Sequence, residues 1–241
     1  MERVLIVDNS PAFANTLAQR FQEMGHVFVR QEESVESLLQ SIRPTALVLD
    51  LAAPGIDGLS VVQHILQCDD PPVVLVTSVL TSNYVIDSLQ RMHISYTMRR
   101  PCTTAMVVNR VKDMLLYKQR KDAQKEVYKK YVFDILSQLK IPMHMKGAKY
   151  AQAALELYLM DQGMYFNGEI YPRIAARYGT DVKCVERCIR NAVDNAWATC
   201  DQQVWGRYFE ADAQGRIRRP SNTVFISRIG QYILAQVQKE Q

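Results

Sequence analysis

Short apolar runs alternate with longer periodic segments over the first half of the chain. The apolar runs predict strands at residues 4–7, 26–30, 45–49, 73–77 and 94–98. Apolar residues at helical spacing predict helices at residues 13–24, 34–42, 59–67 and 81–92, with a long helix from Thr103. Near-continuous apolar strands are typical of a parallel sheet covered by helices on both faces. We therefore predict a doubly wound α/β domain with a five-stranded parallel sheet.

The second half shows helical periodicity throughout. It predicts helices at residues 148–160, 170–178 and 221–236, and another that begins at Asp181 after a Gly179-Thr180 turn. This last helix has an apolar stripe and an opposite polar one, namely Lys183, Arg187, Arg190, Asn191 and Asp194. A helix, a short turn with Gly and a second helix with a basic outer face form the helix-turn-helix pattern. The second half is therefore predicted to be an all-α helix-turn-helix domain.

A charged stretch at residues 117–131 joins the two halves and contains neither Pro nor Gly, so it predicts a helical connection. The predicted organisation is a first domain at residues 1–117, a helical linker at 118–131 and a second domain at 132–241. A length of 241 residues fits two modest domains.

Composition narrows the class of protein. With 48% hydrophobic and 22% charged residues, the chain has the composition of an ordinary globular protein. No apolar run approaches the roughly 20 residues that a transmembrane helix needs, and the N-terminus does not resemble a signal peptide. Five cysteines, an odd and sparse set, favour reduced thiols. We therefore expect a cytoplasmic protein that does not associate with membranes.

Charge is distributed unevenly between the halves. Residues 1–117 hold 9 basic and 12 acidic side chains, a net charge of −3, whereas residues 118–241 hold 20 and 13, a net charge of +7. A basic second half indicates a polyanion such as double-stranded DNA as its partner, although a solvated basic surface is the alternative.

Polar residues stand where the predicted strands end, at Asp8, Asn9, Asp50, Thr77 and Arg100. Ligands of doubly wound sheets bind outside the carboxyl ends of the strands, so these side chains are expected to meet at one edge. Carboxylates are ligands that Mg²⁺ prefers, and a hydroxyl with a cation suits phosphoryl oxygens. The sequence therefore predicts a site for a divalent cation and a phosphoryl group.

The first domain resembles the flavodoxin-like receiver domain of two-component response regulators. The resemblance rests on Asp8-Asn9, the stretch LVLDLAAPGIDG around Asp50, Thr77 and Arg100-Pro101. It implies that Asp50 is the phosphoacceptor, that a histidine kinase or phosphotransfer protein supplies the phosphoryl group, and that Thr77 and Arg100 receive its oxygens. It also implies an Mg²⁺ site made by Asp8, Asn9, Asp50 and the carbonyl of Ala52.

Three positions depart from the receiver pattern. Asn9 replaces a second acidic residue, Arg100 replaces a Lys, and Thr97 replaces an aromatic switch residue, with Tyr96 one position earlier. A neutral Asn9 weakens Mg²⁺ binding, while the guanidinium of Arg100 can pair with Asp50 and mimic part of the phosphorylated state. We therefore predict an atypical pocket that is slow to phosphorylate or locked, with DNA binding largely independent of Asp50.

The second domain resembles the effector domain of the stage-zero sporulation regulators. The matching stretches are IPMHMKG at 141–147, IYPRIA at 170–175, VERCIR at 185–190 with Ala196-Trp197, and PSN at 220–222 with Phe225-Ile226. The resemblance implies a transcription factor that binds promoter DNA as a homodimer on adjacent sites, bridged partly by residues 221–236. Phe225, Ile229 and Ile233 form an apolar stripe there that is either core or interface.

Candidate DNA contacts lie on the helix from Asp181. Arg187 and Arg190 suit guanine edges, and Lys183 suits phosphate. Glu186 either accepts from a cytosine amino group or orients Arg190 one turn later, and Asn191 completes the set. The main alternative function is a pseudo-receiver protein that antagonises another regulator without strong DNA binding. Motifs for nucleotide hydrolysis, hydrolases and metalloproteases are absent, so an enzyme is not predicted.

Overall fold

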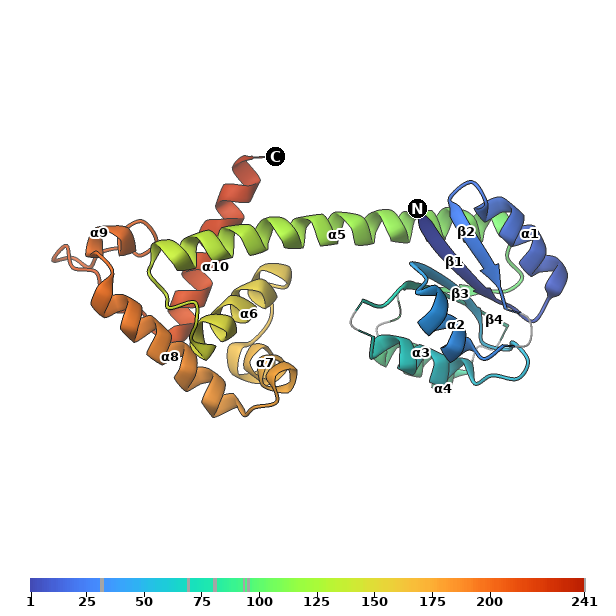
Figure 1. The fold of residues 1–241 in the computed structure, drawn as a ribbon, viewed down its shortest axis with the longest axis horizontal. Helices are drawn as coiled ribbons and strands as arrows, with labels where there is room; N and C mark the ends of the chain where they lie inside the picture. The colour runs from blue at the N-terminus through green and yellow to red at the C-terminus, as the bar shows by residue number, and fades with distance from the viewer. Residues whose placement is uncertain (31–32, 69, 80–81, 93, 95, 241) are drawn as a thin grey trace. The chain divides into compact units, whose positions relative to one another are not determined.

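The computed structural model describes residues 1–30, 33–68, 70–79, 82–92, 94 and 96–240 (Figure 1). The chain divides into two compact units, Met1–Lys121 and Asp122–Gln241, and each is described by itself below. Among the described residues, no helix is long and apolar enough to cross a membrane.

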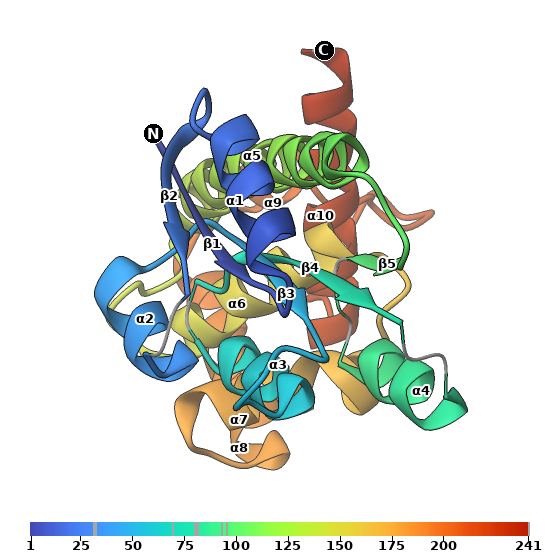
Figure 2. The same ribbon diagram turned by 90° about the vertical axis from the view of Figure 1, so that its right-hand side faces the viewer.

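The first unit contains a five-stranded parallel sheet with the strand order β2-β1-β3-β4-β5. Its strands are β1 (Glu2–Val7), β2 (Gly25–Val29), β3 (Ala46–Asp50), β4 (Val73–Ser78) and β5 (Tyr96–Arg99). Its helices are α1 (Pro11–Phe21), α2 (Val35–Ile42), α3 (Gly58–Leu66), α4 (Asn83–Arg91) and the first part of α5 (Thr104–Gln138). Two faces are covered: α1 and α5 lie on one side, and α2, α3 and α4 on the other (Figure 2).

Alternation along the strands explains this double coverage. Val4 and Ile6 of β1 pack in the cluster with α1 and α5, whereas Leu5 and Val7 pack in the cluster with α2, α3 and α4. All five residues of β3 are buried, as a central strand requires. The predicted doubly wound fold is confirmed, with strand ends within two residues of those expected.

Polar caps set where the helices begin. Ser10, Ser34, Asp57 and Ser82 each accept a hydrogen bond from a backbone N–H in the first turn of α1, α2, α3 and α4. These caps explain why each of these four helices begins one or two residues before or after the start that apolar periodicity predicted. Thr81, at the predicted start of a helix, and Ser95, inside a predicted strand, lie outside the described residues.

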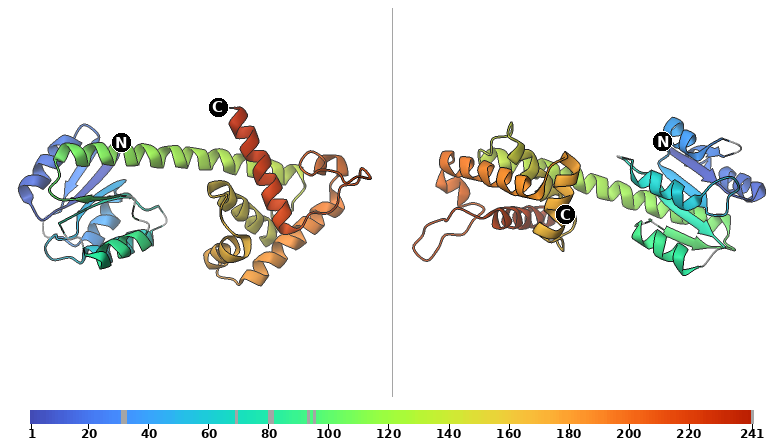
Figure 3. Two further views of the ribbon diagram at one scale, coloured as in Figure 1. Left: turned by 180° about the vertical axis from the view of Figure 1, so that it is seen from behind. Right: turned by 90° about the horizontal axis from the view of Figure 1, so that it is seen from below.

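The second unit is helical (Figure 3). Its helices are the last part of α5, α6 (Lys146–Met160), a π-helical turn η1 (Phe166–Ile170), α7 (Tyr171–Tyr178), α8 (Val182–Thr199), α9 (Gln202–Trp205) and α10 (Asn222–Lys239). Residue 170, predicted to begin a helix, instead ends the π-helical turn, and α9 was not predicted. Trp205 lies at the centre of the core, with the rings of Trp197, Phe209 and Phe225 around it.

Two glycines have structural roles that a side chain would disturb. Gly179 adopts a left-handed conformation, with φ of 60°, between α7 and α8, as the predicted turn requires. Gly147 allows α6 to approach α8 closely, because a Cβ there would lie 2.0 Å from the carbonyl oxygen of Cys188. In α10, Phe225, Ile229 and Ile233 are fully buried, so the apolar stripe belongs to the core of this unit.

Candidate functional site

The carboxyl edge of the sheet gathers the polar residues predicted in the first unit. Asp8 follows β1, Asp50 ends β3, Thr77 lies in β4 beside Asp50, and Arg100 follows β5. Asp50 and Thr77 are almost completely buried, and the side chain of Asp8 is fully buried. Asn9, also predicted here, is exposed. Side-chain contacts in the structure join four of the five predicted strand-end residues, and Asn9 follows Asp8 directly in the chain.

Arg100 contacts every other member of this cluster. Its Nη2 donates a hydrogen bond to Oδ2 of Asp8 and lies 3.8 Å from Oδ2 of Asp50. Its Nε donates to the Thr77 hydroxyl at 3.2 Å, and the guanidinium lies 4.6 Å from the ring centre of Phe13. The expected ion pair of Arg100 with Asp50 is present, but the carboxylate that accepts a hydrogen bond from Arg100 is that of Asp8. One cation thus neutralises part of the charge of two buried carboxylates.

Backbone N–H groups hold the remaining carboxylate oxygens. Oδ1 of Asp8 accepts from the N–H of Ser10 at 2.9 Å, and Oδ1 of Asp50 accepts from the N–H of Ala52 at 2.9 Å. Each carboxylate therefore has one oxygen fixed by the backbone and one directed towards Arg100.

An Mg²⁺ ion would need the same carboxylate oxygens that Arg100 contacts. The third acidic position of the receiver pattern is the neutral Asn9, so only Asp8 and Asp50 supply carboxylates. In the described part of the chain, no cluster of three or more His, Cys, Asp or Glu side chains could hold a metal. With Arg100 hydrogen-bonded to Asp8, an Mg²⁺ ion would have to displace the guanidinium before it could bind both carboxylates.

The position of the missing aromatic switch lies on β5. Thr97 is exposed, and the neighbouring Tyr96 is about one-third exposed, with the Arg110 guanidinium 4.4 Å from its ring centre. A cavity of about 550 Å³ separates α4 from this strand and is lined by residues that include Val76, Leu89, Thr97 and Met98. The cation–π contact fixes Tyr96 beside α5.

In the second unit, α8 carries the residues predicted to contact DNA. Asp181 caps it by accepting from the N–H of Cys184 at 2.8 Å. Its apolar stripe is buried, comprising Val185, Ile189, Ala192, Val193 and Ala196. Lys183, Arg187, Arg190 and Asn191 are exposed. The predicted basic outer face of this helix is therefore confirmed as an exposed surface.

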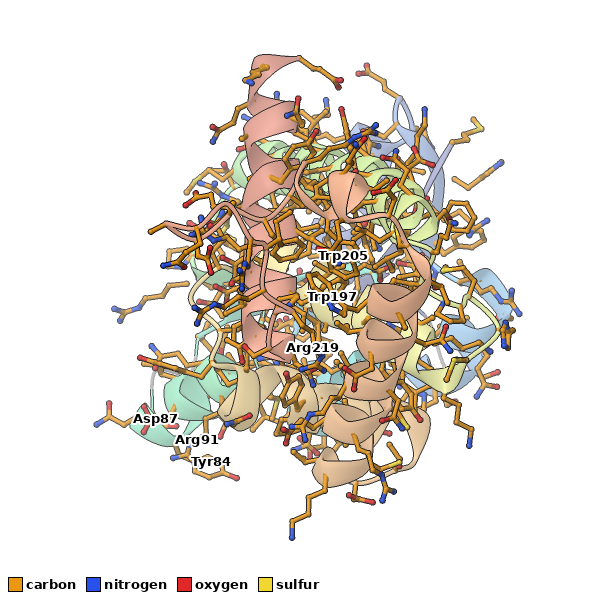
Figure 4. The ribbon with its side chains drawn as sticks, turned by 90° about the vertical axis from the view of Figure 1, so that its left-hand side faces the viewer. Tyr84, Asp87, Arg91, Trp197, Trp205 and Arg219 are labelled. Atoms are coloured by element: carbon orange, nitrogen blue, oxygen red, sulfur yellow. The ribbon has the colours of Figure 1, made fainter. Side chains whose placement is uncertain are left out.

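One side of α8 contacts the start of α10 and the residues just before it through a hydrogen bond and an ion pair. Glu186 pairs with Arg190 one turn later, and the carbonyl of Glu186 accepts from Nδ2 of Asn222 at 2.8 Å. Arg219, which Figure 4 shows between α8 and α10, pairs with Asp194. A cavity of about 440 Å³ lies here, lined in part by Arg190 and Arg219. Arg219 was not predicted from the sequence, where its one signal is the basic pair Arg218-Arg219 before Pro220.

Lys183 and Arg187 differ from Arg190 in their electrostatic surroundings. Neither forms an ion pair with any residue in the ranges that the structure describes, whereas the charge of Arg190 is partly neutralised by Glu186. Their positive charges therefore remain available to an external anion.

Comparisons with known proteins identify both units. Residues 4–112 match the family model of the response regulator receiver domain, and residues 132–233 match that of the sporulation initiation factor Spo0A C terminal. The chain is a Spo0A-like response regulator. A Spo0A-like regulator of this organisation is a sporulation-type transcription regulator, a class that is not typically enzymatic. Receiver domains generally bind Mg²⁺ at the phosphorylation site.

Solved structures similar to this Spo0A-like regulator include three proteins with low sequence identity. The receiver domain of a putative LuxO repressor protein from Vibrio parahaemolyticus is 22% identical, with a TM-score of 0.45, over 51% of this chain and 95% of that one. A LuxR-family DNA-binding response regulator from Staphylococcus aureus is 13% identical, with a TM-score of 0.43, over 48% and 99%. DrrB from Thermotoga maritima is 18% identical, with a TM-score of 0.44, over 49% and 54%.

Proposed function

We propose that this regulator binds promoter DNA through α8 and that its receiver pocket is held in one state by Arg100. The observation that carries the proposal is the set of contacts that Arg100 makes with Asp8, Asp50 and Thr77. In a receiver, the cation and the hydroxyl of this pocket contact the oxygens of the incoming phosphoryl group. Here these two groups, Arg100 and Thr77, are hydrogen-bonded to each other.

Phosphorylation of Asp50 is expected to be slow for three physical reasons. Its Oδ2, the oxygen that is not held by the backbone, lies beside the guanidinium at 3.8 Å. The Thr77 hydroxyl accepts a hydrogen bond from Arg100, so the guanidinium is held in the pocket by Thr77 as well as by Asp8. The pocket also lacks a third carboxylate, because residue 9 is Asn. A histidine kinase or phosphotransfer protein is therefore proposed as a partner that transfers a phosphoryl group to Asp50 only after Arg100 has left these contacts.

DNA recognition is assigned to five residues of α8. We assign Arg187 to a guanine edge and Lys183 to a phosphate, because both are exposed and outside ion pairs among the described residues. Glu186 orients Arg190, and Asn191 lies on the same exposed face. One helix-turn-helix reads few base pairs, so we propose a homodimer on adjacent half-sites.

The proposed organisation keeps the boundaries expected from the sequence. A receiver at residues 1–117 and an effector at residues 132–241 are joined by residues 118–131, which lie inside the continuous helix α5 and whose Tyr128 packs in the core of the second unit.

Labelling with acetyl phosphate tests the receiver half of this proposal. The wild-type chain is expected to incorporate little phosphate, whereas the N9D/R100K double variant should incorporate more, because it regains a carboxylate and a Lys. Adding D50A to the double variant should abolish the gain. DNA affinity of the wild-type chain should be unchanged by D50A. Robust incorporation in the wild-type chain, lost in D50A and accompanied by a tenfold gain in DNA affinity (~1.4 kcal/mol), would contradict the proposal.

A salt-dependent mobility shift on promoter DNA tests the effector half. The wild-type chain should prefer its site over a scrambled sequence, and K183A should flatten the salt dependence by roughly one ion. No sequence preference in the wild-type chain would favour the alternative of a protein that acts through protein–protein contacts.

A further inference from the structure

Two cysteines on α8 take part in none of the roles described so far. Cys184 and Cys188 are one helical turn apart, both are partly exposed, and their sulfur atoms lie 3.9 Å from each other. They alternate with the proposed DNA contacts Lys183 and Arg187 along the helix. A chemical change at this pair would therefore act directly on the surface that meets DNA.

The two thiols differ in reactivity. Hydrogen bonding with Thr180, and next with Cys188, lowers the pKa of Cys184, which lies in the first turn of α8 where backbone N–H groups favour negative charge. Burial, followed by the hydrogen bond with Cys184, raises the pKa of Cys188. Cys184 is therefore the thiol that supplies a thiolate first, with Cys188 within reach as its partner.

Joining these sulfurs requires a local change in the helix. Cβ atoms one turn apart in an α-helix are about 5–6 Å from each other, whereas a disulfide needs a Cβ separation of about 3.5–4.5 Å. The sulfur atoms themselves must approach from 3.9 Å to about 2.05 Å. Side-chain rotation cannot supply all of this movement, so the backbone of one cysteine must shift towards the other.

The structure indicates which cysteine can move. The carbonyl oxygen of Cys188 lies where a Cβ on Gly147 would be only 2.0 Å away, so α6 packs tightly against the backbone at this position. Cys184 lies one turn nearer the start of α8, where Asp181 caps the helix by accepting from the N–H of Cys184. A shift of this first turn, with Lys183, therefore does not have to move the backbone that packs against Gly147.

We propose that Cys184 and Cys188 form a reversible intrahelical disulfide that distorts the first turn of α8 and weakens DNA binding. The oxidant is a small-molecule disulfide. The Cys184 thiolate attacks one of its sulfurs, forms a mixed disulfide and releases the first small thiolate. Cys188, as its thiolate, then attacks Sγ of Cys184 and releases the second. The cysteines lose two electrons and two protons, and the small-molecule disulfide becomes two thiols.

The experiment uses the full chain, oxidised glutathione and a fluorescent promoter duplex. This readout rests on the proposed DNA binding by α8. Oxidation should remove the mass of two hydrogen atoms, and peptide mapping should place the bond between residues 184 and 188. DNA affinity should fall at least tenfold and return on addition of dithiothreitol. C184S and C188S should bind DNA as the reduced wild-type chain does and should not respond to the oxidant, whereas the exposed-thiol control C68S should keep the response.

Three results would overturn the proposal. The first is that no disulfide forms between residues 184 and 188 at any ratio of oxidised to reduced glutathione. The second is that a different pair of cysteines forms the disulfide in its place. The third is a 184–188 bond that leaves both DNA affinity and backbone amide exchange in residues 182–187 unchanged. If the reduced wild-type chain binds no DNA specifically, the proposed function fails. Mass and amide exchange then still decide whether the disulfide forms and distorts the helix.

Discussion

The two units place their charges in opposite ways. At the edge of the sheet, Asp8 and Asp50 are buried, and Arg100 is largely covered, with 13% of its side chain exposed. On α8, Lys183 and Arg187 are exposed and outside any ion pair in the described ranges. The first cluster consists of charges that satisfy one another, and the second of charges that face solvent.

This difference shows how the same residue type can serve structure in one place and recognition in another. A buried guanidinium cannot remain unpaired, because its removal from water costs a large free energy that only partner groups can offset. Arg100 is therefore bonded to the groups that a phosphoryl transfer would use. Arg187 is hydrated at little cost and exchanges water for a DNA anion when one approaches.

Removing the buried cation should have the largest effect. R100A leaves two buried carboxylates without a counterion, so we expect the free energy of unfolding of the first unit to fall by about 3–5 kcal/mol. Mg²⁺ should restore part of this stability in R100A, because the ion can then bind the two carboxylates of the folded state. It should have little effect on the wild-type chain, where Arg100 occupies these carboxylates. Calorimetry with and without Mg²⁺ measures both.

The neighbouring residue provides the control for this experiment. Arg99 is exposed, so R99A should change the stability of the first unit by about 0.5 kcal/mol or less. If R100A destabilises no more than R99A, the contacts of Arg100 contribute little and the comparison between the clusters fails.

Removing an exposed cation should affect binding rather than stability. R187A is expected to weaken binding to the promoter site by about 1–3 kcal/mol and to relax the preference at one base pair. Fluorescence anisotropy against single-base variants of the site measures this change. R120A, in the exposed middle of α5, is the matched control. Unchanged discrimination in R187A would show that another residue reads the base.

Asp57 is intermediate between the two clusters, because it is exposed but fixed by hydrogen bonds at the start of α3. D57A should lower stability by about 1 kcal/mol at neutral pH, as loss of an N-cap does. The hydrogen bond from Ser60 lowers the pKa of Asp57 below 3.8. The stabilisation by the ionised form is therefore present above that value and lost as the pH falls through the folded-state pKa. D57N should keep most of the cap, and a D57A effect equal at pH 7 and pH 2 would contradict this reading.

The smallest effect on stability is expected from the exposed ion pair of α8. E186Q removes the partner of Arg190, and such pairs contribute only about 0.3–0.5 kcal/mol. Urea unfolding followed by tryptophan fluorescence suits this measurement, because both tryptophans lie in the second unit. A loss above about 1 kcal/mol would mean that the pair is not a surface interaction.

Much of the pocket could be predicted because parallel strands end at one edge. Asp8, Asp50, Thr77 and Arg100 were expected together for that reason, and the registers of β1 with β3, β3 with β4 and β4 with β5 bring the ends of these strands side by side. The choice of Asp8 over Asp50 as the hydrogen-bonded partner of Arg100 could not be predicted. Backbone N–H groups hold both carboxylates alike, so the choice depends on how far each remaining oxygen lies from the guanidinium, which the sequence pattern does not specify.

In the second unit, periodicity predicted α8 and its exposed face, because burial of one stripe leaves the opposite stripe in solvent. It did not predict α9 or the π-helical turn, which are too short to show a period. The contact of Asn222 and Arg219 with α8 was also missed, since it joins residues far apart in the sequence.

The continuity of α5 has a consequence for how the protein unfolds. Leu115 packs in the core of the first unit and Tyr128 in that of the second, whereas none of residues 116–127, all of which the structure describes, is buried. Helices usually unwind from free ends, and this middle stretch has none, because both of its flanks are packed. Melting of either core would create such an end. Residues 116–127 should then unwind up to the core that remains folded. The helix in this stretch is therefore expected to melt together with the less stable of the two units.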